Sequence, residues 1–479
     1  MSQSVSNPVR IKAKDRALPH PPYRIPVLGD LWDLHITDSS QWGMKGAQQY
    51  GDIYERNIVG TRVTYVSDPD LLIEINDDQH WSKFLGVPIR NLREIARDGL
   101  FTAHNSEPNW AKAHAILAPS FTAQAMRGYH QTMVEVAGQL TSLWHSKPAG
   151  SWIDVSADMN KTTLEIIGRC AFGYDFDSFT DSGEHALVSA MLRELRYINR
   201  AAYSHPLVEM TVFRNQWKQH REDVQMVHDL VDDVVASRKA TGPGGKGDLL
   251  DRMLVEPDPD TGELLDDANV RNQILTFLVA GHETSAGALA FALHYLSLNP
   301  EVVKEARREI ESVWVDGTPT FEQVSKLRAT RRIVDETLRL WPVAPGYFRK
   351  ANVDTMLGGQ HPFEKGEWVF VVLLQLHRNA LWGSDAEEFN PDRFLPERTR
   401  GRHPEIYRPF GVGMRACIGR QFAYHEILIV LATIIQNFDI EPDPDYTLQV
   451  RETITLKPEG LRVKLHPLRD LDLAAQRTN

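Results

Sequence analysis

Residues 410–419 read Phe-Gly-Val-Gly-Met-Arg-Ala-Cys-Ile-Gly, and they place Cys417 where a thiolate can bind a metal cofactor. The glycines allow tight turns, so that a flat ligand or main-chain N–H groups can approach the sulfur closely. Arg415 lies two residues away, and the apolar stretch Ile418–Ile435 predicts a helix that begins at the cysteine. A helix N-terminus and a cation both favour the thiolate form of cysteine. We therefore expect Cys417 to be a metal ligand rather than an inert core thiol.

Two other interpretations of this region fail. The chain has only two cysteines, so neither a disulfide framework nor a four-cysteine zinc site is available. The spacing Gly411-x-Gly413-x-x-Ala416 also matches a relaxed dinucleotide-binding fingerprint, with acidic Asp439 at about the expected 20 residues further on. That motif must follow a buried strand, whereas residues 401–409 carry prolines and no apolar run.

The pattern Phe-x-x-Gly-x-Arg-x-Cys-x-Gly resembles the haem-thiolate loop of the cytochrome P450 family. Its fixed positions here are Phe410, Gly413, Arg415, Cys417 and Gly419. The resemblance implies haem b as the cofactor, with Cys417 as the iron ligand and with Phe410 and Gly411 in the loop around it. It also implies the fold of that family, which is mainly α with a smaller β region in a single large triangular domain.

The composition limits the class of protein. With 479 residues and 42% apolar content, the chain can bury a large core. Its net charge of −11 argues against a nucleic-acid partner. The start of the chain is polar, and no stretch of about 18 consecutive apolar residues occurs, so we expect no signal peptide and no membrane anchor. Two cysteines and no targeting segment are typical of a reducing cytoplasm.

Length alone favours about three domains, but the helical periodicity from residue 109 to 340 has no clear boundary. We therefore expect a polar tail at residues 1–18 and one haem-thiolate monooxygenase domain at 19–466. Residues 467–479 would be a C-terminal tail or the start of a linker to an absent reductase.

A second motif, Leu-Val-Ala-Gly-His-Glu-Thr-Ser at residues 278–285, lies inside the apolar segment Ile274–Leu296. Burying Glu283 without a partner would cost several kcal/mol, on the order expected for an unpaired charge. Glu283 could reach a salt bridge, and Thr284 could bond back to the carbonyl of Ala280. A zinc-protease motif is excluded because residue 286 is alanine.

The same motif resembles the family's oxygen-activation helix. By that resemblance the Thr284 hydroxyl holds water over the haem, Glu283 feeds protons, and Ala280 lies beside the cofactor. Oxygen activation consumes protons inside a dry pocket, which gives a buried acid and hydroxyl a reason to be there.

Glu336 and Arg339 share one helix face at i, i+3 spacing. An ordinary surface ion pair is the alternative. The resemblance implies that this pair joins Arg393, from the run Pro-Asp-Arg-Phe, in a structural cluster that braces the cysteine loop. Trp110 and His114 likewise share a face, and by the same resemblance they bind the haem propionates together with Arg415 and Arg349.

The stretches Gly99–Thr102, Asn109–His114, Pro119–Phe121, Ala125–Tyr129 and Arg415–Gly419 resemble the haem domain of bacterial reductase-fused fatty-acid hydroxylases, and the similarity covers about residues 20–465. It implies that Phe101 controls access to the iron, that Ala280 and Ala344 line the substrate pocket, and that residues 178–215 roof the channel. Those hydroxylases anchor the fatty carboxylate with an arginine and a tyrosine. The tyrosine corresponds to Tyr65, but the arginine position is Thr61, and Arg62 should point to the other face of the strand.

The expected reaction is insertion of one oxygen atom of O2 into an unactivated C–H bond of a lipophilic substrate. Terminal or subterminal hydroxylation of fatty acids comes first, and oxidation of a terpenoid or polyketide-like metabolite is the alternative. The partners would be O2, the substrate and a flavin or iron–sulfur electron donor, either separate or fused. A peroxygenase usually lacks the acid–threonine pair, and a non-catalytic haem sensor would need no proton relay.

Overall fold

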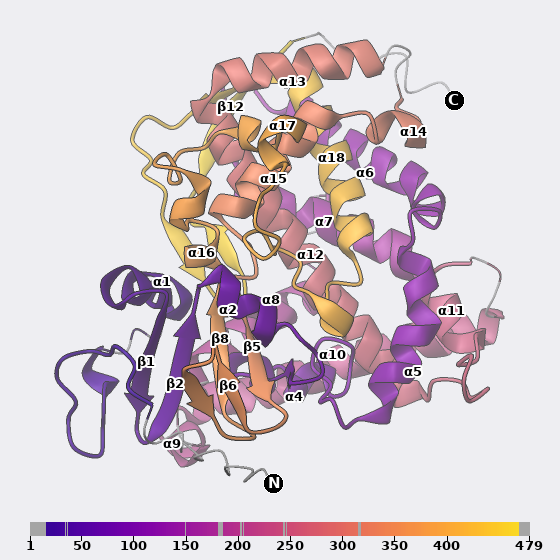
Figure 1. Ribbon diagram of the computed structural model, residues 1–479. Coiled ribbons are helices and arrows are strands. Elements are labelled where there is room, and N and C mark those ends of the chain that lie inside the picture. The colour runs from indigo at the N-terminus through magenta and orange to yellow at the C-terminus, as the bar shows by residue number, and fades with distance from the viewer. Residues whose placement is uncertain are drawn as a thin grey trace, which may run out of the picture.

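The computed structural model describes residues 16–468, apart from short stretches at 34, 36, 149, 181–184, 202–203, 205, 243–244, 246 and 315–317. Helices account for 55% of the chain and strands for 12%, which confirms the expected mainly α class with a smaller β region. Figure 1 shows the sheet at one corner of the molecule, with the long helices filling the rest. The expected tails lie almost entirely outside the described residues.

Among the described residues, helices alone occupy the middle third of the chain, and the strands lie in its first and last thirds. The helices are η2 (Leu31–Asp33), α1 (Ser39–Tyr50), α2 (Pro69–Ile75), α3 (Val87–Asn91), α4 (Arg93–Ala96), α5 (Pro108–Leu117), η3 (Ala118–Phe121), α6 (Met126–Ser146), α7 (Val155–Phe172), α8 (Ala186–Ala201), α9 (Pro206–Thr211), α10 (Arg214–Thr241), α11 (Leu249–Val255), α12 (Asp267–Leu298), α13 (Pro300–Val313), α14 (Phe321–Val324), α15 (Arg328–Leu340), α16 (Leu373–Leu376), η4 (Ala380–Trp382), η5 (Pro391–Phe394), α17 (Pro396–Thr399), η6 (Gly413–Arg415) and α18 (Arg420–Asn437). The strands are β1 (Ile53–Ile58), β2 (Thr61–Val66), β3 (Trp81–Lys83), β4 (Trp152–Asp154), β5 (Gly346–Ala351), β6 (Thr355–Leu357), β7 (His361–Phe363), β8 (Trp368–Val372), β9 (Phe438–Pro442), β10 (Val450–Glu452), β11 (Leu456–Pro458) and β12 (Arg462–Pro467).

Helix α12 runs through the middle of the fold and carries the expected oxygen-activation motif (Figure 1). Asp266 caps its start by accepting a 2.8 Å hydrogen bond from the Asn269 amide, and the helix ends just before an Asn-Pro pair, which disfavours helical backbone. Its length and apolar composition would suffice to cross a membrane, but 83% of its most apolar window is buried inside the molecule. The helix therefore forms the centre of the core.

The largest sheet has the strand order β1-β2-β8-β5-β3. Strands β1 and β2 form a hairpin, with Tyr54 opposite Tyr65 and a turn at Gly60. Because side chains alternate along a strand, Tyr65 faces the cluster that contains Trp42, while its neighbour Val66 belongs to a separate cluster on the other face. This sheet forms the corner of the molecule opposite α13 (Figure 1).

The cysteine loop lies immediately before α18. We expected the helix to begin at Cys417, but it begins at Arg420, because the loop is closed by a 2.8 Å hydrogen bond from the Cys417 amide to the Phe410 carbonyl. Gly413 adopts a left-handed φ of 66°, and a Cβ built there would lie 2.5 Å from a carboxylate oxygen of Asp78. The tight turn and this close approach both require glycine.

Candidate active site

Cys417 is accessible to solvent, yet so many protein atoms surround its sulfur that desolvation raises the pKa of the thiol. The Gly419 amide and the charge of Arg420 act in the opposite direction. Arg415, which the sequence suggested as the activating cation, points elsewhere. Binding to a metal ion would have to supply the remaining stabilisation of the thiolate, since coordination deprotonates a thiol.

Arg415 lies on the aromatic pair that the sequence predicted. Its guanidinium carbon is 3.8 Å from the ring centroid of Trp110, and the Trp110 and His114 rings stack with their centroids 5.0 Å apart. One terminal nitrogen donates to Asn105 at 3.1 Å, while the other, Nη1, is buried without a partner among the described residues. Burial lowers the pKa of Arg415 to about 10. A buried guanidinium nitrogen without a partner is costly, and a bound anion would satisfy it.

Lys83, at the end of β3, is a further basic side chain near Arg415, and the sequence analysis missed it. Its ammonium donates to the Phe101 carbonyl, and burial together with the charge of Arg415 lowers its pKa to about 7. Burial and Arg415 also lower the pKa of His114. The only signal in the sequence was a lysine in a short strand after a tryptophan. Lys83, Arg415 and His114 together favour an anionic ligand.

Arg349 does not join this group, and its expected propionate contact needs correction. Its guanidinium donates to the carbonyls of Ile75 and Trp81, at 3.0 Å each, and to the Asp78 carboxylate at 2.8 Å. These contacts tie β5 to the segment that follows α2. Asp78 also accepts a hydrogen bond from the Met414 amide at 3.2 Å. Arg349 therefore supports the cysteine loop indirectly, because Asp78 accepts hydrogen bonds from both Arg349 and the Met414 amide.

One turn of α12 differs from the rest of the helix. Its neighbours on both sides are buried, whereas Ala280, Gly281 and Thr284 are partly exposed and share one helix face. The Thr284 hydroxyl donates to the Ala280 carbonyl at 2.7 Å, which is the local bond considered from the sequence. This turn gives the middle of the core a small, solvent-accessible face that carries a hydroxyl group.

Glu283 points away from that face into a buried ion pair. Its carboxylate accepts from the Lys457 ammonium at 2.7 Å and from the Thr455 hydroxyl at 3.0 Å. Desolvation would raise the pKa of Glu283, but the Lys457 charge and these hydrogen bonds outweigh it, so the pKa lies below its ordinary value. The salt bridge considered for Glu283 from the sequence is present, and its partner comes from β11.

Two expected pocket residues, Phe101 and Ala344, each follow a residue that contacts α12. Half-buried Phe101 follows Leu100, whose amide donates to Gln273 at 2.9 Å, one to two turns before Ala280. Ala344 is exposed although its neighbour Val343 is buried and packs against Gly287 of α12. Leu100 thus anchors the chain on α12 before the accessible face, and Val343 anchors it after that face.

Tyr65 does not lie at an open surface, and its expected role needs correction. It is 7% exposed and stacks on Tyr54 with ring centroids 4.7 Å apart, inside the aromatic cluster of the sheet. Thr61 is exposed at the start of β2, and Arg62 lies on the other face, 3.6 Å from the Glu55 carboxylate. Arg62 therefore points away from Tyr65, as the strand periodicity predicted. Among the described residues, β2 offers no arginine–tyrosine anchor for a carboxylate.

The three charges of the expected structural cluster come together. Arg339 and Glu336 are fully buried and form a bidentate pair at 2.7 and 2.8 Å, and Arg393 lies 3.3 Å from the same carboxylate. Arg339 also donates to the carbonyls of His377 and Ala386. The cluster therefore ties α15 to the long irregular segment that leads to the cysteine loop.

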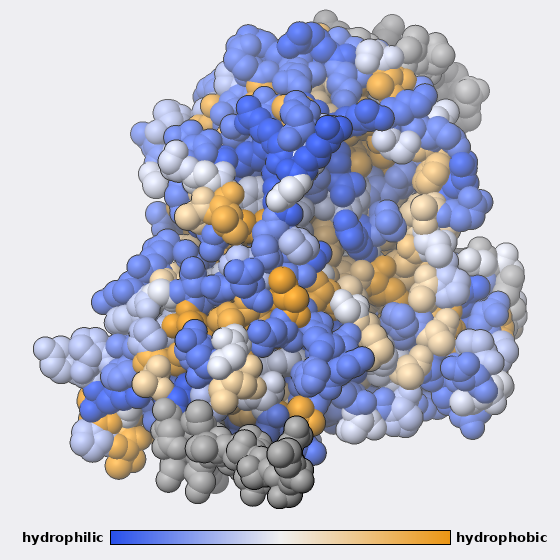
Figure 2. Space-filling view, viewed as in Figure 1, coloured by the Kyte–Doolittle hydropathy of each residue, from blue (hydrophilic) through white to orange (hydrophobic). Residues whose placement is uncertain are grey.

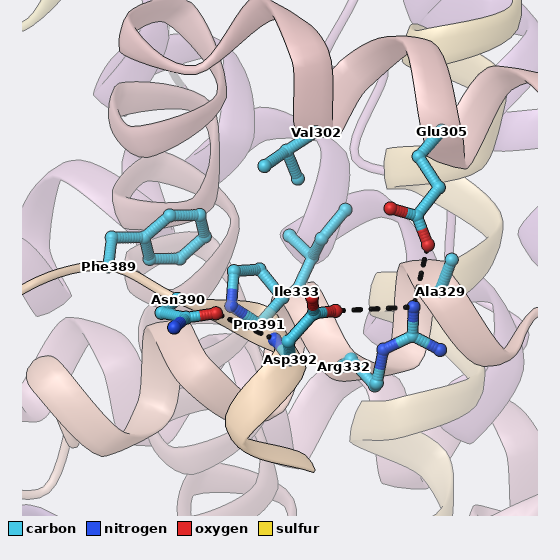
Figure 3. A pocket seen from close by; sticks show the side chains of 9 residues that line it. All are labelled: Val302, Glu305, Ala329, Arg332, Ile333, Phe389, Asn390, Pro391 and Asp392. Carbon is cyan, nitrogen blue, oxygen red and sulfur yellow. Dashed lines mark hydrogen bonds and ion pairs between the residues drawn. The ribbon is translucent and has the colours of Figure 1, made fainter. Parts of the chain in front are cut away.

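A separate cavity of about 120 Å³ lies beside this cluster, between α13, α15 and η5 (Figure 3). Its Arg332 is held by Glu305 at 2.7 Å and lies 3.9 Å from Asp392. Apolar side chains, including Phe389, close the other side. None of the expected site residues lines this cavity, so it is not part of the candidate active site.

Glu426 of α18 is a further buried acid, and the sequence analysis did not single it out. Glu426 is 0% exposed. Among the described residues, neither of its carboxylate oxygens has a hydrogen-bond partner of standard geometry. The nearby Ser285 hydroxyl acts to lower the pKa of Glu426. Burial nevertheless raises the pKa of Glu426 to about 8. An acid inside the apolar stretch that follows the cysteine motif was the available signal.

This shift predicts a pH-dependent stability. The folded protein keeps the Glu426 proton up to about pH 8, whereas the unfolded chain releases it near its ordinary pKa, so this contribution to stability is lost as the pH rises between these values. Glu426→Gln should flatten that dependence and, at about pH 8, raise the free energy of unfolding by on the order of 2–4 kcal/mol. Melting temperatures of both proteins from about pH 5 to 8 test this. Parallel curves would contradict it.

The comparisons with known proteins agree with this geometry. The family model for cytochrome P450 matches residues 19–465. The chain belongs to the cytochrome P450 family. A crystal structure of a cytochrome P450 (CYP102L1) superposes with a TM-score of 0.88 at 45% sequence identity, covering 94% of this chain and 99% of that one. The P450 fold expected from the cysteine loop is therefore confirmed.

The similar curated proteins are fusions. A bifunctional cytochrome P450/NADPH–P450 reductase of Bacillus cereus is 40% identical over 95% of this chain and 43% of that protein. The bifunctional cytochrome P450/NADPH–P450 reductase 2 of Bacillus subtilis is 39% identical over 96% of this chain and 44% of its own length. A self-sufficient cytochrome P450 monooxygenase of Phanerodontia chrysosporium, CYP505E3, is 35% identical over 94% of this chain. This P450 spans less than half the length of these relatives.

Haem b is the cofactor of this family, and the residues present fit it. Cys417 offers an accessible sulfur at the start of α18, where the iron would bind. The basic side chains Lys83, Arg415 and His114, with the buried unpartnered nitrogen of Arg415, suit the two carboxylates of the porphyrin, because an anion would stabilise their charged forms. Trp110, beneath the Arg415 guanidinium, orients that group. The donor set thus matches an iron porphyrin dicarboxylate.

Proposed function

We propose that this P450 is a monooxygenase that inserts one oxygen atom of O2 into an unactivated C–H bond of a lipophilic substrate. We further propose that its substrates are medium- and long-chain fatty acids, hydroxylated at or near the end of the chain. The accessible turn of α12 supports the proposal most strongly, because it places a hydroxyl group and small side chains beside an otherwise dry core. The relatives named as P450 monooxygenases support the same class of reaction.

Haem, when bound through Cys417, supplies the activation of O2 and the oxygen transfer itself. Ala280 and Ala344 leave room for an apolar chain, and Phe101 limits how that chain approaches the cofactor. The Thr284 hydroxyl uses its one hydrogen to donate to the Ala280 carbonyl, so its oxygen can still accept a hydrogen bond from a water molecule and hold it in the pocket.

Glu283 is the proposed proton carrier behind Thr284. Its pKa is lowered, so in the described arrangement it is an ionised acceptor bound to Lys457. To carry a proton, the Glu283 carboxylate must release its hydrogen bonds from Lys457 and Thr455 and accept one from water on the pocket side. Lys457 thus sets the charge state of the relay, a role that the motif alone did not show.

The electron donor is proposed from the relatives. Those proteins are named as fusions with an NADPH–P450 reductase, so we propose that electrons reach this P450 from such a reductase, either fused or separate. The cytoplasmic location expected from the cysteine content stays a prediction.

A second candidate substrate class follows from β2. Thr61 replaces the expected arginine, Arg62 faces Glu55, and Tyr65 is buried, so β2 lacks the carboxylate anchor of the fatty-acid hydroxylases. This arrangement favours a neutral lipophilic molecule, such as a terpenoid or polyketide-like metabolite, over an acidic one. Both candidates use the same catalytic residues and differ only in how the substrate is held.

A binding titration tests both candidates. The purified ferric protein is titrated with saturated fatty acids of increasing length and with the matching fatty alcohols as neutral controls, and the Soret band is followed. A high-spin shift with the acids, tighter by about tenfold than with the alcohols, supports fatty-acid hydroxylation. Tighter binding of the alcohols or of a neutral terpenoid supports the second candidate. A protein that takes up no haem at all would overturn the monooxygenase proposal.

A further inference from the structure

A buried histidine on α10 is held between two carboxylates from two other helices. Nδ1 of His220 is 2.5 Å from Glu194 of α8, and Nε2 is 2.8 Å from Glu94 of α4. The side chains of His220 and Glu194 are only 5% and 1% exposed, whereas Glu94 is 62% exposed. Tyr197, one turn after Glu194, stacks on the imidazole with ring centroids 4.2 Å apart and planes 13° apart. We call Glu94, His220 and Glu194 the clamp.

The clamp requires a charged histidine. Each ring nitrogen faces a carboxylate, and an imidazole can donate from both nitrogens only as the cation. Burial would lower the pKa of His220, but the hydrogen bonds to Glu194 and Glu94 outweigh it and raise the pKa to about 9. At neutral pH the clamp is therefore a cation between two anions, with its inner half shielded from water.

The clamp joins α8, which lies in the segment 178–215 expected to roof the substrate channel, and α10 to the segment that carries Phe101. Helices α4 and α10 both pack on α12, and α10 also packs along α8 (Figure 1). From α4 the chain runs through Gly99, where a Cβ would lie 2.1 Å from the Thr276 hydroxyl, to Phe101. Thr276 is one turn before Ala280 on the same helix face. A change in how α4 is held thus reaches the accessible face of α12.

We propose that the clamp is a latch that holds α8 and α10 on the Phe101 segment and sets how fast a substrate enters and leaves the pocket. This inference rests on the proposed function in one respect, namely that the face of Ala280 and Thr284 lines a substrate pocket. His220 is then a positioning residue, because it acts through the helices it joins. Glu94 is the part of the latch that water can reach, so it is where the latch opens. Figure 2 shows one face of the molecule coloured by hydropathy, on which hydrophilic residues predominate and hydrophobic groups are scattered.

Other charged groups around the clamp define its pH dependence. Glu94 faces it from α4 with Arg97 nearby, Asp223 lies near Glu194, and Tyr197 of α8 hydrogen-bonds Glu209 of α9. Since the pKa of His220 is raised, the attraction is complete below the ordinary imidazole value and is lost as the pH rises through about 9. The latch should therefore loosen at alkaline pH.

Stopped-flow binding of 4-phenylimidazole to the ferric holoprotein tests the latch, because this azole binds haem iron whatever the native substrate is. In Glu94→Gln and His220→Gln, both the association and the dissociation rate constants should rise by roughly tenfold, since each variant removes a charge-assisted hydrogen bond. The dissociation constant of the azole, which is the ratio of the two rate constants, should change little. Cyanide, which is small enough to enter without opening the roof, should bind at the wild-type rate. Wild-type azole rates should also rise above about pH 9, and those of His220→Gln should not.

Arg193→Gln is the matched control, because Arg193 pairs with Asp223 and so joins the same two helices, α8 and α10, through a different ion pair. Its azole rates should stay within about twofold of the wild type, because the Arg193 side chain is 43% exposed and Asp223 keeps a hydrogen bond from Gln219. Hydrogen exchange of the haem-free chain gives a readout independent of the cofactor. Residues 93–102 and α8 should exchange faster in Glu94→Gln than in Arg193→Gln. If both clamp variants bind the azole at the wild-type rates and show wild-type hydrogen exchange, the latch proposal is wrong. That result would not affect the proposed reaction.

Discussion

Replacing Cys417 by alanine is expected to remove the thiolate-haem absorption spectrum and to lower the haem content of the purified protein by roughly tenfold or more. Cys417 is the accessible thiol of the chain, and it lies in a loop held by the Phe410 carbonyl at the start of α18. The remaining contacts to the porphyrin carboxylates would not supply an iron ligand. Haem-to-protein ratios and the absorption spectrum of the reduced carbon monoxide complex measure the effect.

Cys170→Ala is the matched control for this prediction. Cys170 is buried in α7, burial raises its pKa well above the ordinary value, and it packs in the main core. Its replacement should leave haem content and spectrum unchanged and should cost about 1 kcal/mol of stability through a small cavity. A Cys417→Ala protein that keeps a thiolate-type spectrum would contradict the assignment of the iron ligand.

Replacing Glu336 by glutamine should be the most damaging single change to the fold outside the cysteine loop. The substitution leaves the guanidinium groups of Arg339 and Arg393 buried without their shared anion. Breaking a buried pair in this way costs about 3–5 kcal/mol. Because Arg339 also holds the carbonyls of His377 and Ala386, the segment that leads to the cysteine should loosen, and haem should be lost together with stability.

Lys304→Gln provides a control with the same helical spacing. Glu301 and Lys304 form an i, i+3 pair on α13, but their side chains are 82% and 60% exposed. Because water screens such a pair, its loss should cost less than about 0.5 kcal/mol. Denaturant melts followed by fluorescence and by the Soret band measure both variants. Equal effects of Glu336→Gln and Lys304→Gln would show that the buried cluster does not brace the cysteine loop.

Short motifs predicted the local geometry of the candidate site well, because the residues of each motif are close in sequence. The cysteine loop, the Glu336–Arg339 pair and the Trp110–His114 pair each lie within one turn of helix or one loop, so sequence spacing fixes their geometry. Predictions that depended on contacts between distant segments were less secure. Arg349 was assigned to the haem propionates, but its donors bind Ile75, Asp78 and Trp81, which lie about 270 residues earlier in the chain.

The sequence by itself determined the family and the mainly α class, and it predicted Cys417 as the iron ligand, because these depend on short patterns whose spacing is set by helix and loop geometry. Only the tertiary structure decided the charge states. Lys457 ionises Glu283, burial keeps the proton on Glu426, and carboxylates from two helices charge His220. Each of these states depends on desolvation and on partners that the fold brings together from distant positions, and neither quantity can be read along a single chain.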